Sequence, residues 1–253
     1  MEENKTISQE ELEQLKRDAE QGDAEAQCSL GQCYARGWGV ETNLDVAFYW
    51  YAKAAEQGVV PAMSFIGQCY DFGKGVPCNM GKAVYWFTKA AEQGSSDAQF
   101  DLGTCYANGE GVEQNYEQAV YWYTKASEQG NLDALYNLGK CYERGEGVKQ
   151  DYNKAASLMT RGAEQGDSDA QCCLGDYYAN GTGVPQDISK ALHLYHLSEE
   201  QGNEYAQFNI GECYEQGKGV EQDINQAIHW YTLSAEQGYE DAIEALERLK
   251  NNE

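Results

Sequence analysis

Positive charge is scarce in this sequence. Its 18 Lys and Arg residues stand against 42 Asp and Glu residues, which gives a formal net charge of −24. A strongly negative surface repels nucleic acid and anionic membranes, so we expect neither as a partner, and any charged partner should be basic overall. Long apolar runs are missing too. No stretch reaches the roughly 18 apolar residues of a membrane-spanning helix, so we expect no membrane insertion.

A secretory signal and a closed set of disulfides are also lacking. The first 18 residues, MEENKTISQEELEQLKRD, are polar and acidic and have no apolar core. The nine cysteines are an odd number, which fits free thiols in a reducing compartment better than a disulfide framework. These features predict a cytoplasmic location. A secreted or host-delivered form is the alternative if the sequence was trimmed.

What the sequence does contain is a 36-residue repeat. The text from Ala119 to Ala155 returns when it is shifted by 36 residues in either direction. A Glu-Gln-Gly triplet recurs in phase, with its glycine at Gly22, Gly58, Gly94, Gly130, Gly166, Gly202 and Gly238. Such self-similarity is the sequence signature of stacked supersecondary units. Because a repeat array grows by stacking and has no internal boundary, we expect a single domain over residues 1–253.

Each unit reads as two helices joined by a Gly-x-Gly-Val turn. In the fourth unit the first helix places Ala134, Leu138, Cys141 and Tyr142 on one face. A further glycine stands inside each first helix, at Gly31, Gly67, Gly103, Gly139, Gly175 and Gly211. Each costs about 1 kcal/mol relative to alanine, so we expect the partner helix to approach closely there.

Both ends of the array carry the features of terminal caps. Ser8-Gln9-Glu10-Glu11 is a capping box that starts a helix over 8–21, which amounts to half a repeat. Six full repeats follow over 22–237, and a last helix over 238–253 ends the array. In that helix Glu247 and Lys250 replace the glycine and tyrosine of the repeat, which gives the polar outer face a cap needs. We therefore expect a complete protein or domain.

The repeat unit A-x-x-x-L-G-x-x-Y-x-x-G-x-G-V-x-x-D/N-x-x-x-A-x-x-W-Y-x-x-A-A-E-Q-G resembles the Sel-1-like repeat, a relative of the tetratricopeptide repeat. The resemblance covers Ser8 to about Leu249. It implies an all-α fold, an α-solenoid in which antiparallel helix pairs stack into a right-handed superhelix. It also implies an adaptor or scaffold role, and it implies no single substrate.

One cysteine-rich, secreted branch of that family has been linked to β-lactam binding or hydrolysis, but this chain departs from it. The paired cysteine positions of that branch read Ala54-Ala55 and Ala90-Ala91 here. The cysteines present form one column instead, at Cys33, Cys69, Cys105, Cys141 and Cys213. Neighbouring helices pack about 8–10 Å apart, beyond the reach of a disulfide, so we interpret this column as small core residues.

No catalytic, metal or cofactor site follows from residue spacing. His193 and His196 are three residues apart on a helix and His229 lies one repeat beyond His193, but no third or fourth zinc ligand converges on them. The tryptophan column Trp50, Trp86, Trp122 and Trp230 has the phase of inter-repeat core. Cys172-Cys173 and Cys78 are harder to place, and a reactive thiol there is the alternative to a buried one.

The variable face of the first helices is the candidate binding surface, because in tetratricopeptide relatives it lines the concave groove. Trp38, Phe65 and Phe72 are candidate apolar anchors, with contact to the N-terminal helix as the competing explanation. Asparagine amides can both donate to and accept from a peptide backbone, and Lys140 with Arg144 could hold a carboxylate. The candidate residues are Arg36, Trp38, Phe65, Gln68, Phe72, Asn108, Asn137, Lys140, Arg144, Asn180, Asn209 and Gln216.

Three functions fit these features, and the first is favoured. The chain is a non-enzymatic scaffold that binds a peptide or a partner protein in the groove and is itself a monomer or weakly self-associating. The second hypothesis is a hydrolase acting on a cell-wall or β-lactam-like substrate. The third is a structural spacer without a specific ligand. An ordinary solvated helix face also explains the polar residues of the groove.

Overall fold

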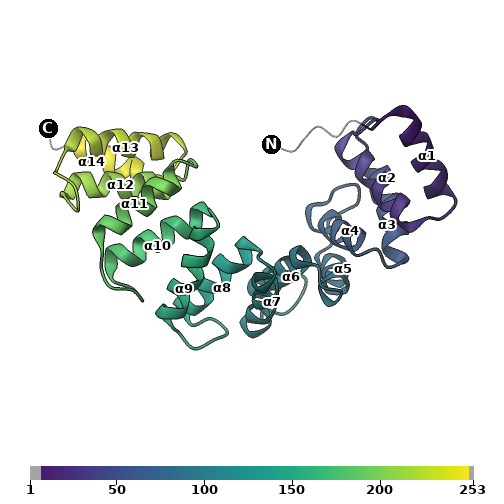
Figure 1. The fold of residues 1–253 in the computed structure, drawn as a ribbon, viewed down its shortest axis with the longest axis horizontal. Coiled ribbons are helices and arrows are strands. Elements are labelled where there is room, and N and C mark those ends of the chain that lie inside the picture. The colour runs from purple at the N-terminus through teal and green to yellow at the C-terminus, as the bar shows by residue number, and fades with distance from the viewer. Residues whose placement is uncertain (1–6, 251–253) are drawn as a thin grey trace. The chain divides into compact units, whose positions relative to one another are not determined.

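The computed structural model describes residues 7–250, which form fourteen helices and no strand (Figure 1). Seven belong to a compact unit over 1–131: α1 (Gln9–Glu20), α2 (Ala24–Arg36), α3 (Leu44–Glu56), α4 (Val60–Phe72), α5 (Met80–Glu92), α6 (Ser96–Asn108) and α7 (Tyr116–Glu128). The other seven belong to a unit over 132–253: α8 (Leu132–Arg144), α9 (Tyr152–Glu164), α10 (Ser168–Asn180), α11 (Ile188–Glu199), α12 (Glu204–Gln216), α13 (Ile224–Glu236) and α14 (Glu240–Lys250).

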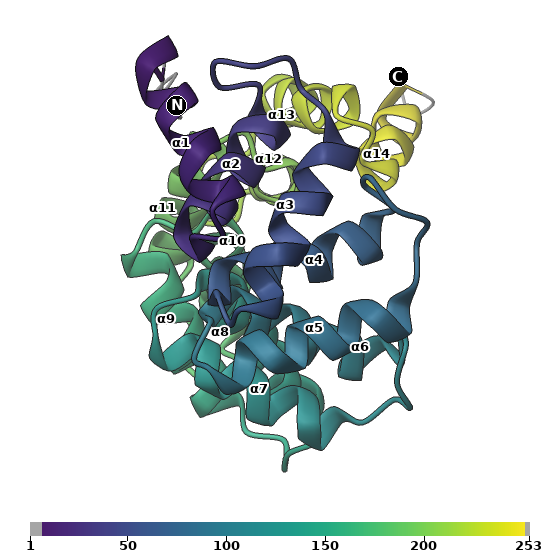
Figure 2. The same ribbon diagram turned by 90° about the vertical axis from the view of Figure 1, so that its right-hand side faces the viewer.

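Within each of these units, named unit 1 and unit 2 here, each helix packs against the next one along the chain (Figures 1 and 2). The predicted all-α fold built from repeated helix pairs is confirmed. The single domain over 1–253, its subdivision into caps and repeats, and the right-handed superhelix stay predictions. The segments 1–6 and 251–253 of that domain lie outside the described residues.

Side-chain caps start almost every helix whose start is characterised. First helices are capped by Asp23, Ser95, Asp167 and Asn203, and second helices by Asn43, Asn79, Asn115, Asp151, Asp187 and Asp223. The expected exception is Val59, which provides no side-chain hydrogen bond to α4. The capping box at Ser8 and Glu11 is present at the start of α1. These polar residues therefore fix the helix boundaries that the sequence predicts.

The mid-helix glycines sit where the partner helix comes closest, as predicted. A Cβ at Gly67 would lie 2.5 Å from ring carbons of Phe87, and one at Gly175 would lie 2.5 Å from Cε1 of Tyr195. The same contact recurs between Gly31 and Tyr51, Gly103 and Tyr123, Gly139 and Met159, and Gly211 and Tyr231. The large residue of each second helix thus packs directly on the backbone of its own first helix.

The cysteine column is part of the core. Cys33, Cys105, Cys141 and Cys213 are buried and Cys69 is half-buried. Burial raises the pKa of Cys141 and of Cys213 to about 11, because the thiolate would lose its hydration. The tryptophan column is half-buried on the second helices. Both columns therefore pack between helices, as their phase predicts.

The glutamine of the Glu-Gln-Gly triplet has a role that its place at a helix end does not reveal. Gln57 Nε2 donates to Oε1 of the buried Gln27 at 2.8 Å and to the carbonyl of Gly22 at 3.1 Å. Gln27 Nε2 in turn donates to the carbonyl of Ala19 at 3.0 Å. The amide pair recurs as Gln99 with Gln129, Gln171 with Gln201, and Gln207 with Gln237. It joins the two ends of one helix hairpin.

Candidate functional site

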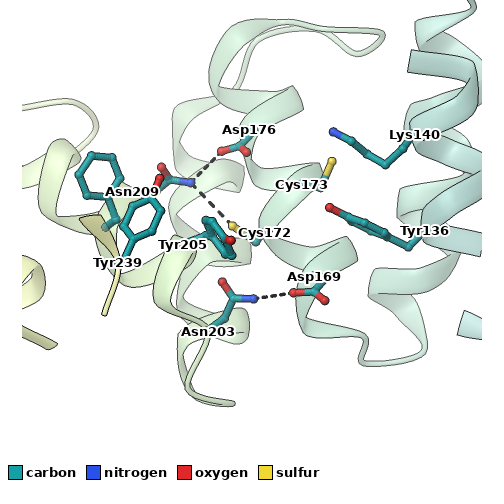
Figure 3. Close-up of a pocket in the computed structure, with 11 residues that line it drawn as sticks. Tyr136, Lys140, Asp169, Cys172, Cys173, Asp176, Asn203, Tyr205, Asn209 and Tyr239 are labelled. Carbon is teal, nitrogen blue, oxygen red and sulfur yellow. Dashed lines mark hydrogen bonds between the residues drawn. The ribbon is translucent and has the colours of Figure 1, made fainter. Parts of the chain in front are cut away.

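The first helices of unit 2 line a cavity of about 410 Å³ (Figure 3). Its walls come from α8, α10 and α12 and from the turns that precede α12 and α14. We name it the unit 2 cavity. It lies on the first-helix face that the sequence singles out, and two of the predicted residues, Lys140 and Asn209, line it.

Helix α10 supplies the floor of the unit 2 cavity. Asp169, Cys172, Cys173 and Asp176 follow one another at steps of three, one and three, which places them on one helical face. Both thiols are buried. Burial raises the pKa of Cys173 to about 11 and that of Cys172 still further. The thiols are therefore protonated at neutral pH and poor nucleophiles.

Each carboxylate of the cavity accepts hydrogen bonds from neutral groups. Asp169 Oδ1 accepts from Asn203 Nδ2 at 2.8 Å. Asp176 Oδ1 accepts from Asn209 Nδ2 at 2.8 Å and from the Tyr195 hydroxyl at 2.8 Å. Figure 3 shows the two asparagine amides pointing from the α12 side toward these aspartates. The asparagines thereby hold the carboxylates in fixed positions.

Aromatic rings form the side of the cavity nearest α14. Tyr205, which is half exposed, meets Tyr239 edge to face at a centroid distance of 5.0 Å. Phe208 meets the same ring at 5.2 Å. Tyr136 faces the cavity from α8 and is half-buried, and desolvation raises the pKa of its hydroxyl. The cavity therefore combines apolar ring surfaces with two carboxylates.

The predicted pair of positive charges has acidic partners within the chain. Lys140 forms an ion pair with Glu143 one turn along α8, and Glu143 also accepts from the Tyr177 hydroxyl at 2.8 Å. Arg144 lies 3.9 Å from a carboxylate oxygen of Glu146. An incoming carboxylate would have to compete with these contacts.

Two of the three predicted aromatic anchors, Phe65 and Trp38, lie at two separate cavities of unit 1. Phe65 and Gln68 line a cavity of about 350 Å³ that α4 shares with α6, and Phe65 stacks on Tyr51 at a centroid distance of 4.7 Å. Trp38 lines a different cavity of about 440 Å³ together with Ile7 and Leu15. Trp38 therefore borders the same cavity as the N-terminal helix, and contact with that helix stays the competing explanation for this residue.

The other predicted residues are more dispersed. Phe72 is 65% exposed, and the ammonium of Lys74 lies 4.9 Å from its ring centroid. The guanidinium of Arg36 lies 5.2 Å from the Trp38 ring. Asn180 lines a small cavity of about 290 Å³ next to Lys218.

Three of the amides bond locally. Asn137 Nδ2 donates to the Asp133 carbonyl at 2.9 Å, Asn108 Nδ2 to Glu110 at 3.4 Å, and Gln216 Nε2 to Glu212 at 3.3 Å. Each of these amides therefore already donates one hydrogen bond within its own helix or turn.

Sequence reasoning missed most of the residues that line the unit 2 cavity. Tyr205 stands in a column that elsewhere holds Asp97, Asp133, Asp169 and Asp241, and this departure was a usable signal. Tyr136 and Phe208 stand in a column that is aromatic at Phe100 as well but holds Cys28, Ser64 and Cys172 in the other repeats. Asn203 and Tyr239 come from the turns between repeats, where helix spacing gives no guidance.

Within residues 7–250, none of the helices combines the length and the apolar character that a membrane span requires. No group of three or more His, Cys, Asp or Glu side chains gathers there in a way that could hold a metal ion.

The family pattern described as the Sel1 repeat matches six consecutive segments, 24–59, 60–95, 96–131, 132–167, 168–203 and 204–239. Among solved structures, a protective antigen of uropathogenic Escherichia coli with an SLR fold is 39% identical, with a TM-score of 0.85 over 94% of this chain. This chain spans about half (51%) of that one. A Sel1 repeat protein from Oxalobacter formigenes is 36% identical, with a TM-score of 0.79 over 88% of this chain and 94% of its own.

A more distant likeness supports the fold alone. Yeast Tom70 is 14% identical, with a TM-score of 0.52 over 96% of this chain and 58% of its own. No curated protein matches the sequence.

Proposed function

Because the chain belongs to the Sel1 repeat family, whose members are generally protein-interaction scaffolds, we propose that it binds a peptide or a partner protein along its first-helix face. The observation that carries this proposal is the unit 2 cavity, which three successive first helices build together. A site that spans several repeats suits an extended chain, because each repeat contacts a different stretch of it.

The charge of the chain indicates the partner. With a net charge of −24, this surface attracts basic proteins and repels nucleic acid. We further propose that the scaffold works in the cytoplasm, because its nine cysteines suit a reducing compartment.

The hydrolase alternative finds no support in the cavity. The Sel1 repeat fold is typically a non-catalytic scaffold. The nucleophilic side chains at the unit 2 cavity are Cys172 and Cys173, and burial raises the pKa of both thiols, whereas a catalytic cysteine needs a lowered one.

Affinity capture followed by mass spectrometry tests the proposal, and calorimetry then measures the affinity of the recovered partner. The informative variant is Tyr205→Ala, which removes a half-exposed ring from the cavity. Its matched control is Tyr121→Ala in α7, since both rings are 50% exposed and both meet one aromatic neighbour edge to face at about 5 Å.

We expect Tyr205→Ala to weaken binding at least tenfold and Tyr121→Ala to leave it within twofold. Equal loss in both variants, or none in either, would place the partner elsewhere. Failure to recover any stoichiometric partner would favour the spacer hypothesis.

A further inference from the structure

We propose that the unit 2 cavity binds an arginine side chain of the partner, an inference that rests on the proposed function. Arginine combines a flat cation with an apolar stem, and the cavity offers the complement of each. The argument has three steps, which concern the carboxylates, the surrounding charges and the rings.

The two carboxylates of α10 are held in place and each has an oxygen to spare. Asp169 and Asp176 are seven residues apart, which places their Cα atoms about 10.5 Å apart along the helix. The Oδ1 atoms take all the hydrogen bonds described above, from Asn203, Asn209 and Tyr195. The Oδ2 atoms accept none from the described residues. A cation entering the cavity thus meets two oriented acceptors.

Among the described residues, neither carboxylate has a cation in ion-pair contact. Lys140 lines the cavity, but its ammonium is paired with Glu143. Burial raises the pKa of Asp169, and the neighbouring charges of Asp167 and Glu204 raise it further.

Burial likewise raises the pKa of Asp176. This effect outweighs the hydrogen bond from Tyr195 and the charge of Lys140, which both lower that pKa. A positive charge from outside would stabilise both carboxylates in their ionised form.

The rings favour arginine over lysine or a metal ion. Tyr136 and Tyr205 come to the cavity from different helices, and a planar guanidinium can stack on such rings while its stem packs against them. Its N–H donors form a planar fork that can make two parallel hydrogen bonds to one carboxylate, which a compact ammonium cannot do. A metal ion would need more oxygen ligands than two aspartates supply.

The experiment titrates the whole chain with a blocked tripeptide, acetyl-Gly-Arg-Gly-amide, at low salt and follows backbone amide signals by NMR. Two matched peptides carry lysine or citrulline in place of arginine. Citrulline keeps the shape of arginine but has no charge. We expect the arginine peptide to shift signals of α8, α10 and α12, to bind several-fold more tightly than the lysine peptide, and to weaken as salt is added.

The variants Asp169→Asn and Asp176→Asn remove the charge and keep an oxygen that accepts the existing hydrogen bonds, so the helices should stay intact. We expect each to weaken the arginine peptide at least fivefold and the double variant to abolish detectable binding. The control is Asp133→Asn, because Asp133 is exposed, as Asp169 is, and occupies the same position in the preceding repeat, but does not line the cavity. Circular dichroism checks the helix content of each variant. If the double variant is unfolded, peptide binding to the two single variants tests the inference.

Three outcomes would overturn the inference: equal binding of the citrulline peptide, unchanged binding to both single variants, or shifts confined to helices away from the cavity. A failed inference is distinguishable from a failed function. If the captured partner depends on Tyr205 but neither it nor the peptide depends on the two aspartates, the groove stands and the arginine site falls.

Discussion

The packing of Phe87 on Gly67 makes a sharp test of how one repeat is held together. Replacing Gly67 by alanine places a Cβ 2.5 Å from Cδ1 and Cε1 of Phe87, and 3.2 Å from Cγ. Phe87 is only 1% exposed, so its ring has no free space to enter. The added methyl group would clash with three carbons along one edge of the ring, so the two helices have to move apart.

Two effects of opposite sign set the size of the change. Alanine stabilises a helix interior by about 1 kcal/mol relative to glycine. Overpacking of a dense core costs about 1–3 kcal/mol. We therefore expect Gly67→Ala to lower the free energy of unfolding by up to about 2 kcal/mol. Alanine would raise that free energy if helix propensity alone mattered, so the sign of the change is the result to measure.

The control for this variant is Gly81→Ala. Gly81 lies at the start of α5, and a Cβ there meets only Asn79 Oδ1 at 3.6 Å, an ordinary contact. We expect this variant to be as stable as the wild type or more stable by up to about 1 kcal/mol. Urea unfolding followed by circular dichroism compares the two, and amide exchange in α4 and α5 shows where protection is lost, since repeat arrays can unfold in parts.

A second substitution separates the ring contact from other causes. Phe87→Leu replaces the ring by a smaller branched side chain, so Gly67→Ala should cost less in that background than in the wild type. If Gly67→Ala unfolds at the same urea concentration as the wild type or a higher one, close helix approach is not the reason for the glycine. If Gly67→Ala destabilises the Phe87→Leu variant as much as the wild type, the ring of Phe87 is not what opposes the added methyl group.

Three further predictions concern single side chains. The hydrogen bond from Arg248 lowers the pKa of Glu215, so this pair contributes stability above the unfolded pKa of about 4.3 that is lost as pH falls through the lowered value. Arg248→Gln should thus reduce the urea midpoint more at pH 7 than at pH 3; an equal reduction at both would refute the pairing. Gln99→Glu buries a carboxylate that faces the Ala91 carbonyl, so its destabilisation, measured by thermal unfolding, should shrink as pH falls toward 4. Cys78 is exposed while the other cysteines are buried or half-buried, so one thiol should react fast with a chromogenic disulfide reagent and Cys78→Ser should remove that phase; a fast phase that survives would contradict the burial of the rest.

Most of the fold could be predicted because equivalent positions of the repeats carry the same residue types. A residue type that recurs every 36 positions has the same neighbours each time, so six copies of one weak signal add up to a strong one. The caps at Asn43 and Asp151 and the packing behind Gly139 follow from that logic. The Gln27–Gln57 pair was missed although both residues stand in columns, because the hydrogen bond joins the two ends of a hairpin and helix periodicity relates only neighbours on one helix.

The candidate site was harder to predict because it consists of departures from the columns. Lys140 and Asn209 were found on the variable face, but Tyr205 occupies a position that is acidic in four of the five other repeats, and Tyr239 belongs to a turn. Which departures meet in space depends on how successive repeats rotate, and a spacing rule for one helix does not contain that rotation. The local partners of Asn137 and Arg144 could not be predicted either, because they depend on side-chain rotamers.

The glutamine pairs bear on how such a chain changes its length. Both members of each pair, such as Gln99 and Gln129, lie within one matched repeat. The hydrogen bond that Gln99 makes to the preceding repeat is accepted by the main-chain oxygen of Ala91, and every residue has such an oxygen. When a whole 36-residue block is duplicated or lost, every glutamine amide therefore still has a hydrogen-bond partner where the remaining repeats join. A gene that carries this unit can therefore lengthen or shorten its product by whole repeats while each glutamine keeps a hydrogen-bond partner.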